Sequence, residues 1–242
     1  MQEKVQGFVV TLMKYNDRHN ILHLYTREQG MVSLLVPIRK GRRQGVHHAL
    51  FQPFIEVSAE IESSPRRSFA QLREVALLSP WHRVYASPVR SSLLFFLAEV
   101  MERSVRETGA DVLLYEFVMG AIAFLEQTDE RVTLFHHLFL YQLTEHLGFP
   151  PNLEHYHPTA LFDMKEGRFV ATAPPHRSVL EPREAQTIKT LRKMRWETMH
   201  LYDFTLAQRR VMLEYIVEYY QLHIPAFGTL RSLAVLQELS AP

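Results

Sequence analysis

The stretch Ile55-Glu56-Val57-Ser58-Ala59-Glu60-Ile61-Glu62 carries the most regular pattern in the chain. Apolar and polar side chains alternate along it without a break, so one face is apolar and the other is polar. A period of two is typical of a β-strand that packs one face on a core and leaves the other in water. The stretch therefore predicts a half-buried strand.

Four more runs within the first 80 residues favour strands, because β-branched and aromatic residues are concentrated in them. Turn residues separate the runs, at Asn16-Asp17 and at Glu28-Gln29-Gly30. Five short strands in so small a segment are typical of a closed barrel such as the OB-fold. The four runs are Val5–Leu12, Asn20–Tyr25, Met31–Val36 and Phe69–Leu77.

After Ser79-Pro80-Trp81 the apolar period becomes helical. Ser87-Pro88 pairs a capping serine with a proline at the first helical position, and Gly148 followed by Pro150-Pro151 is a double stop signal. Thr205-Leu206-Ala207-Gln208 is a capping box. We expect helices at about 88–109, 112–127, 130–147, 182–194 and 205–223, with an amphipathic tail at 230–236 that folds back onto them.

The segment Thr159–Ala173 interrupts the helical pattern. Two short apolar runs flank Lys165-Glu166-Gly167-Arg168, and Pro174-Pro175 ends the second, which predicts a β-hairpin. The chain as a whole is therefore expected to be α+β. An N-terminal five-stranded OB-fold β-barrel at residues 1–80 is followed by an α-helical domain at 81–242, with the small hairpin inserted at about 150–178.

Composition limits the classes of protein and of site. The chain has 242 residues, 47% of them hydrophobic, so a buried core is expected. It has no cysteine, which excludes disulfides and thiolate metal sites and suits a reducing compartment. The longest apolar stretch, Leu93–Ala98, is far shorter than the ~20 residues of a membrane span. With no signal-peptide core at the N-terminus, we expect a soluble cytoplasmic protein with no membrane partner.

The net charge of +1 conceals an uneven distribution. Residues 1–82 hold eleven Lys and Arg against seven acids, a net charge of +4, and the remaining residues hold sixteen against nineteen, a net charge of −3. A basic N-terminal part attached to a mildly acidic body favours a polyanionic partner.

Catalytic motifs are missing from the sequence. It contains no phosphate-binding glycine loop, no G-x-S-x-G turn and no H-E-x-x-H helix, so we expect a protein that is not an enzyme. His155, His157 and His176 with Asp163 are the strongest candidate zinc ligands, but their spacing fits no recognised pattern. His136-His137 are helical neighbours that point about 100° apart. We therefore assign no metal and no cofactor.

The most informative cluster is the basic loop Arg39-Lys40-Gly41-Arg42-Arg43. Cations crowded in this way need screening by solvent or by a polyanion, and OB-folds bind oligonucleotides through their strand faces and loops. A solvated loop is the plain alternative. Tyr15, His23, Tyr25 and Phe51 are candidate stacking residues, with Phe51 better suited to the core. The predicted DNA-binding residues are Lys14, Arg18, Arg39, Lys40, Arg42, Arg43, Arg66 and Arg67.

Short motifs occur in a fixed order at the two ends of the chain. Those near the N-terminus are Gly7-Phe8-Val9-Val10, Asn16–Leu22, Tyr25–Gly30, the basic loop and Leu50-Phe51-Gln52-Pro53-Phe54. Those near the C-terminus are Tyr219–His223 and Leu230–Leu233. This order resembles the RecO family of recombination-mediator DNA repair proteins. The resemblance covers both ends well and the middle only in architecture.

The resemblance implies a mediator that binds single- and double-stranded DNA and anneals complementary strands. It also implies RecR and the acidic tail of single-stranded DNA-binding protein as partners, so that the recombinase is loaded, in the bacterial cytoplasm at the nucleoid. Many family members carry a four-cysteine zinc module after a motif that matches Leu147-Gly148-Phe149-Pro150 here. The hairpin that follows in this chain has no cysteine, so zinc binding is not carried over.

A second site is expected for that acidic peptide. Cations lie beside Leu191, Met194 and Trp196 at the end of one predicted helix, although cations there also complement the helix dipole. Two other classes of function stay open. One is an OB-fold binder of RNA, other oligonucleotides or sugars without annealing activity, and the other is a protein adaptor. The predicted peptide-binding cations are Lys189, Arg192, Lys193 and Arg195.

Overall fold

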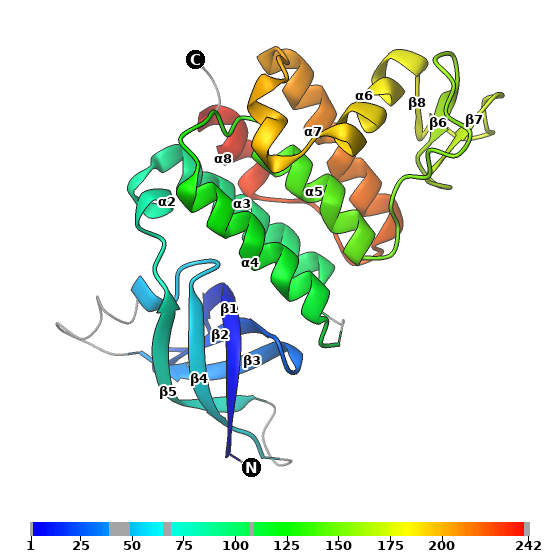
Figure 1. Cartoon of the computed structure of the whole chain (residues 1–242). Helices are drawn as coiled ribbons and strands as arrows, with labels where there is room; N and C mark the ends of the chain where they lie inside the picture. The colour runs from blue at the N-terminus through cyan, green and yellow to red at the C-terminus, as the bar shows by residue number, and fades with distance from the viewer. Residues whose placement is uncertain (1, 39–48, 65–68, 107–108, 240–242) are drawn as a thin grey trace. The chain divides into compact units, whose positions relative to one another are not determined.

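The computed structural model describes residues 2–38, 49–64, 69–106 and 109–239 (Figure 1). The predicted DNA-binding residues of the basic loop and the Arg66-Arg67 pair lie outside these ranges. Lys14 and Arg18 lie inside them.

The N-terminal segment forms the five strands that the sequence predicts. They close into an OB-like ring in the order β1-β2-β3-β5-β4. Neighbours pair antiparallel except β3 and β5, which meet in a short parallel pairing of Leu34 with Ala70 and Leu35 with Gln71. The strands are β1 (Gln2–Lys14), β2 (His19–Thr26), β3 (Gly30–Pro37), β4 (Glu56–Glu62) and β5 (Ala70–Ser79).

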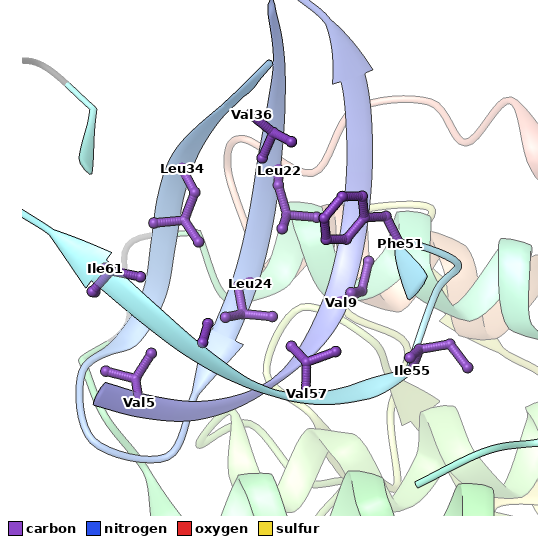
Figure 2. Packing of buried hydrophobic residues seen from close by; sticks show 11 residues of the cluster. Val5, Val9, Leu22, Leu24, Leu34, Val36, Phe51, Ile55, Val57 and Ile61 are labelled. Atoms are coloured by element: carbon purple, nitrogen blue, oxygen red, sulfur yellow. The ribbon is translucent and has the colours of Figure 1, made fainter. Parts of the chain in front are cut away.

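Alternate residues of the strands fill the interior of the ring (Figure 2). Val57, Ala59 and Ile61 of β4 are buried, whereas the polar residues between them are half-buried, as the period of two requires. They pack with residues from β1, β2 and β3 and with Phe51. The other members of this core are Val5, Val9, Leu22, Leu24, Leu34, Val36 and Ile55.

The helices follow the predicted capping signals. The Ser87 side chain accepts a hydrogen bond from the backbone of Arg90, and Thr205 and Gln208 form both hydrogen bonds of the capping box. The helices are α2 (His82–Ala86), α3 (Pro88–Ser104), α4 (Val112–Gln127), α5 (Phe135–His146), α6 (Pro182–Lys193), α7 (Leu206–His223) and α8 (Ser232–Leu239), with a 3₁₀ helix η1 (Trp196–Leu201).

Two helix ends differ from the prediction. Helix α3 ends at Ser104 rather than at Gly109, with the buried Val105 as its C-cap. Helix α5 begins at Phe135, later than expected, and the Phe135 backbone N–H donates to the Val132 carbonyl in the turn that precedes it.

The predicted hairpin forms from β6 (Leu161–Asp163) and β7 (Arg168–Val170). A third strand that was not predicted, β8 (Val179–Leu180), pairs with β6 and makes a small sheet of order β7-β6-β8. The Asp163 carboxylate accepts hydrogen bonds from the backbones of Lys165 and Glu166 and shapes the turn.

The chain divides into two compact units. Unit 1 contains residues 1–127 and 230–236, and unit 2 contains residues 128–229 and 237–242. The barrel therefore shares its unit with α2, α3 and α4. A boundary near residue 80, with a separate barrel domain, stays a prediction. None of the helices in the described ranges is long and apolar enough to span a membrane.

Candidate nucleic-acid interface

The turn between β1 and β2 presents the two described cations of the predicted DNA-binding set. Lys14 and Arg18 are both exposed, and the Lys14 ammonium lies 3.4 Å from the exposed carboxylate of Asp17. An ion pair so open to solvent is weak, so a phosphate can take the place of Asp17 at little cost.

Asn16 holds this turn in one conformation. Its side-chain oxygen accepts hydrogen bonds from the backbone N–H groups of Arg18, at 2.9 Å, and His19, at 2.8 Å. The backbones of Tyr15 and Asn16 both donate to the His19 carbonyl. This is the Asx-turn geometry that makes asparagine favourable in tight turns, and it fixes where the neighbouring side chains leave the barrel.

Two other parts of the barrel meet this turn. The backbone N–H of Ile38, just after β3, donates to the Arg18 carbonyl at 2.8 Å. The ring of Phe69, just before β5, lies 5.7 Å from the ring of Tyr15 in an edge-to-face contact. Ile38 is bonded to the first residue of the basic loop, and the Arg66-Arg67 pair precedes Phe69 closely in sequence. The described chain thus brings one flanking residue of each basic segment to the β1–β2 turn.

The outer face of β2 is not available to a ligand. His23 is buried and its Nδ1 lies 3.3 Å from the Glu102 carboxylate of α3, an interaction that lowers the pKa of Glu102. Tyr25 is fully buried and stacks on Phe8, which also contacts Phe54 and Tyr115 of α4. OB-folds commonly bind oligonucleotides on the β2–β3 face, but here helices α3 and α4 cover the β2 part of it.

This packing corrects part of the stacking prediction. His23 and Tyr25 are buried, so in this structure they cannot stack on bases, whereas the burial of Phe51 confirms the core position expected for it. Tyr15 alone of the four candidates is exposed, with 56% of its surface open. The sequence did not separate His23 and Tyr25 from Tyr15, because the β2 residues alternate correctly for an outward face and only the packing of distant helices decides that this face is covered.

A polar network joins the barrel to α4. The Glu56 carboxylate of β4 accepts hydrogen bonds from Gln6 at 2.7 Å and from the Tyr115 hydroxyl at 2.9 Å, and also from Ser79. Burial, together with this contact, raises the pKa of the Tyr115 hydroxyl well above its ordinary value, so it stays a donor. The network thus links β1, β4 and β5 of the barrel to α4.

The predicted peptide-binding cations lie on and just after α6. Lys189 lies 4.1 Å from the centre of the Tyr156 ring, and Arg192 pairs with Glu145 of α5 at 3.2 Å. Lys193 and Arg195 are exposed. Their spacing puts Lys189, Arg192 and Lys193 on one side of the helix.

An apolar recess lies beside these cations within unit 2. Ile188 and Leu191 of α6 line it, together with residues of α5, α7 and the small sheet. Met194 and Trp196, which the sequence grouped with Leu191, do not line it: Met194 lies beyond the end of α6, and Trp196 packs on Phe135. The other lining residues are Tyr141, Thr144, Pro151, Phe162, Met164, Leu180, Thr187, Met212, Tyr215, Ile216 and Tyr219.

The histidines near the small sheet are dispersed. His176 lies 3.3 Å from the buried Asp163, and the His157 ring bonds the neighbouring Thr159. His155 is exposed. Among the residues that the structure describes, no group of three or more His, Asp or Glu side chains is arranged to hold a metal ion.

Comparisons with known proteins cover nearly the whole chain. Residues 1–81 match the family model "Recombination protein O N terminal", and residues 86–234 match "Recombination protein O C terminal". The chain is 36% identical to the DNA repair protein RecO of Phocaeicola vulgatus over 239 residues, 99% of each chain. It is 35% identical to that of Bacteroides fragilis over 99% of each chain, and 34% identical to that of Porphyromonas gingivalis over 93% of this chain and 94% of the relative.

Proposed function

This chain belongs to the RecO family of DNA repair proteins, and from that premise we propose that it is a recombination mediator that binds single- and double-stranded DNA and anneals complementary strands. It would help to load the recombinase onto DNA covered by single-stranded DNA-binding protein, with RecR as a further partner. The proposed place of action is the bacterial nucleoid, where these substrates are found.

The observation that carries this proposal is the convergence at the β1–β2 turn. Exposed Lys14 and Arg18 lie on a fixed turn, and two residues that border the basic segments in sequence, Ile38 before the basic loop and Phe69 after the Arg66-Arg67 pair, contact this turn. Contacts of this kind bind phosphates without regard to sequence. Annealing breaks no covalent bond, so screening the charge of two strands is sufficient, and we propose that the protein acts without catalytic residues.

Annealing of two complementary labelled strands tests the proposal. The protein should accelerate duplex formation at low salt, and the acceleration should decline steeply as salt rises, because phosphate contacts release counterions. A protein adaptor would leave the annealing rate unchanged at every salt concentration. An oligonucleotide binder without annealing activity would bind the strands and yet not accelerate their pairing.

We also propose that α6 and the adjoining recess bind the acidic tail of single-stranded DNA-binding protein. An acidic peptide with an apolar end needs an apolar pocket for its anchor and cations for its carboxylates. Ile188 and Leu191 line the recess, and Lys189 and Arg192 are on the same helix. The helix-dipole role of these cations stays the plain alternative.

Titration of the tail peptide against variants tests this site. Arg192→Ala/Lys193→Ala should weaken binding, and Glu145→Gln should strengthen it, because Arg192 would lose its competing carboxylate. Arg131→Ala is the control, since Arg131 is an exposed cation of the same unit that faces Asp203. If the double variant binds the peptide as tightly as the parent, the peptide site lies elsewhere on the helices. If the parent protein does not bind the peptide, unit 2 has only a structural role.

A further inference from the structure

Tyr15 is exposed in a way that its neighbours do not explain. Its 56% open surface is the largest among the exposed aromatic residues of the described chain. The other aromatic rings of the barrel that the sequence offered for stacking, His23, Tyr25 and Phe51, are buried. Tyr15 lies on a loop of a small barrel, and OB-folds bind oligonucleotides through such loops.

The ring is held in place before any ligand arrives. Phe69 supports it from a second loop in an edge-to-face contact with an interplanar angle of 68°. The Tyr15 backbone N–H donates to the His19 carbonyl at 3.2 Å, and Asn16 fixes the turn that follows. A ring that is already ordered loses little conformational entropy when a flat ligand group stacks on it.

The cations beside the ring define the class of that ligand. Lys14 and Arg18 flank Tyr15 in sequence on the same turn and are exposed. A flat apolar face next to cations fits a nucleotide whose base stacks while its phosphate is neutralised. Bases in a duplex are stacked on each other and paired, so their faces are closed to a side chain at the surface.

We propose that Tyr15, supported by Phe69, is the base-stacking residue that lets this protein distinguish unpaired nucleotides from duplex DNA. This inference rests on the proposed function and adds a selectivity to it. Phosphate contacts bind both forms of DNA, and the Tyr15 stack adds affinity for the single-stranded form only.

Binding of three probes to matched variants tests the proposal. The probes are a single strand, the same strand with abasic residues, and its duplex. Tyr15→Ala should weaken single-strand binding by about 5- to 150-fold, the range for loss of one stacked base, and leave the other two affinities unchanged. Tyr15→Trp should retain single-strand binding, and Tyr15→Leu, which keeps apolar volume without a π face, should not. Phe95→Ala, at a 52% exposed ring on α3, is the control and should bind as the parent does.

The possible failures are distinct. If Tyr15→Ala binds the single strand as tightly as the parent, or weakens all three probes alike, the stacking assignment is wrong while DNA binding stands. If the parent binds none of the probes, the proposed function itself fails. Because Tyr15 is exposed, its variants should melt at the parent's temperature. A lowered Tm in Tyr15→Ala alone would show that the ring stabilises the fold instead of binding a base.

Discussion

At the scale of single residues, the adjacent histidines of α5 illustrate how burial sets protonation. His136 and His137 lie inside unit 2 and pack with ring centres 4.1 Å apart. His137 Nε2 donates to the Arg209 carbonyl at 2.8 Å, since a carbonyl can only accept. Burial lowers the pKa of both rings, that of His137 to about 4. The pair is therefore a packing feature and carries no charge at neutral pH.

This burial predicts an acid-sensitive fold. In the unfolded chain these histidines titrate near pH ~6.5, so the unfolded state binds more protons than the folded state between pH ~6.5 and ~4. Stability should be complete above that window and decline as the pH falls through it. Replacing His137 with Gln should remove about 3 kcal/mol of this pH-dependent loss, as measured by denaturant unfolding at several pH values. The exposed His155→Gln is the control, and equal pH slopes in the parent and the His137 variant would contradict the assignment.

At the scale of elements, the sequence predicted the features that depend on residues close together in the chain. The alternation in β4 and the caps at Ser87 and Thr205 all appear in the structure, because periodicity and capping depend on near neighbours. Strand β8 has only two residues, Val179 and Leu180, and it exists because β6 offers an edge to pair with. Tyr25 likewise packs in a ring cluster through Phe8, which contacts Tyr115 of α4, a helix distant in sequence. Contacts between residues so distant in sequence cannot be predicted from the local sequence pattern.

The β6–β7 turn gives a prediction for one element. Gly167 has a φ of 64°, and a Cβ built on it would lie 2.6 Å from the hydroxyl oxygen of Tyr219. Tyr219 is buried and donates to the Phe149 carbonyl, so it cannot move aside easily. Gly167→Ala should therefore destabilise the protein by about 1–2 kcal/mol or more, measured by thermal melting. The control is Gly120→Ala in α4, where the space is open, and it should be neutral or stabilising by up to about 1 kcal/mol. Equal effects of the two changes would show that the turn is not held against α7.

At the scale of the whole molecule, the barrel shares a hydrophobic boundary with its helices. Phe8, Tyr25 and Phe54 are fully buried, and Tyr115 of α4 completes their cluster. A fragment of residues 1–80 would expose three aromatic rings to water, at a cost of about 1.5–3 kcal/mol for each one. We expect this fragment to bind a hydrophobic dye and to melt without cooperativity, whereas residues 1–127 should melt cooperatively. Cooperative melting of the short fragment without dye binding would establish the barrel as an independent domain.

We propose that the β1–β2 turn and the basic loop bind DNA through phosphate contacts. The most direct measurement is the dependence of DNA affinity on salt for the parent and for a variant with Arg39, Lys40, Arg42 and Arg43 replaced by Ala. The variant should bind more weakly, and its plot of log K against log salt should flatten by about 0.7 per lost contact on single strands and about 0.9 on duplex. A matched variant that removes four exposed cations of unit 2, Lys165, Arg168, Arg177 and Arg183, should keep the parent's slope. If the N-terminal variant retains the parent's affinity and slope, the basic loop does not bind DNA.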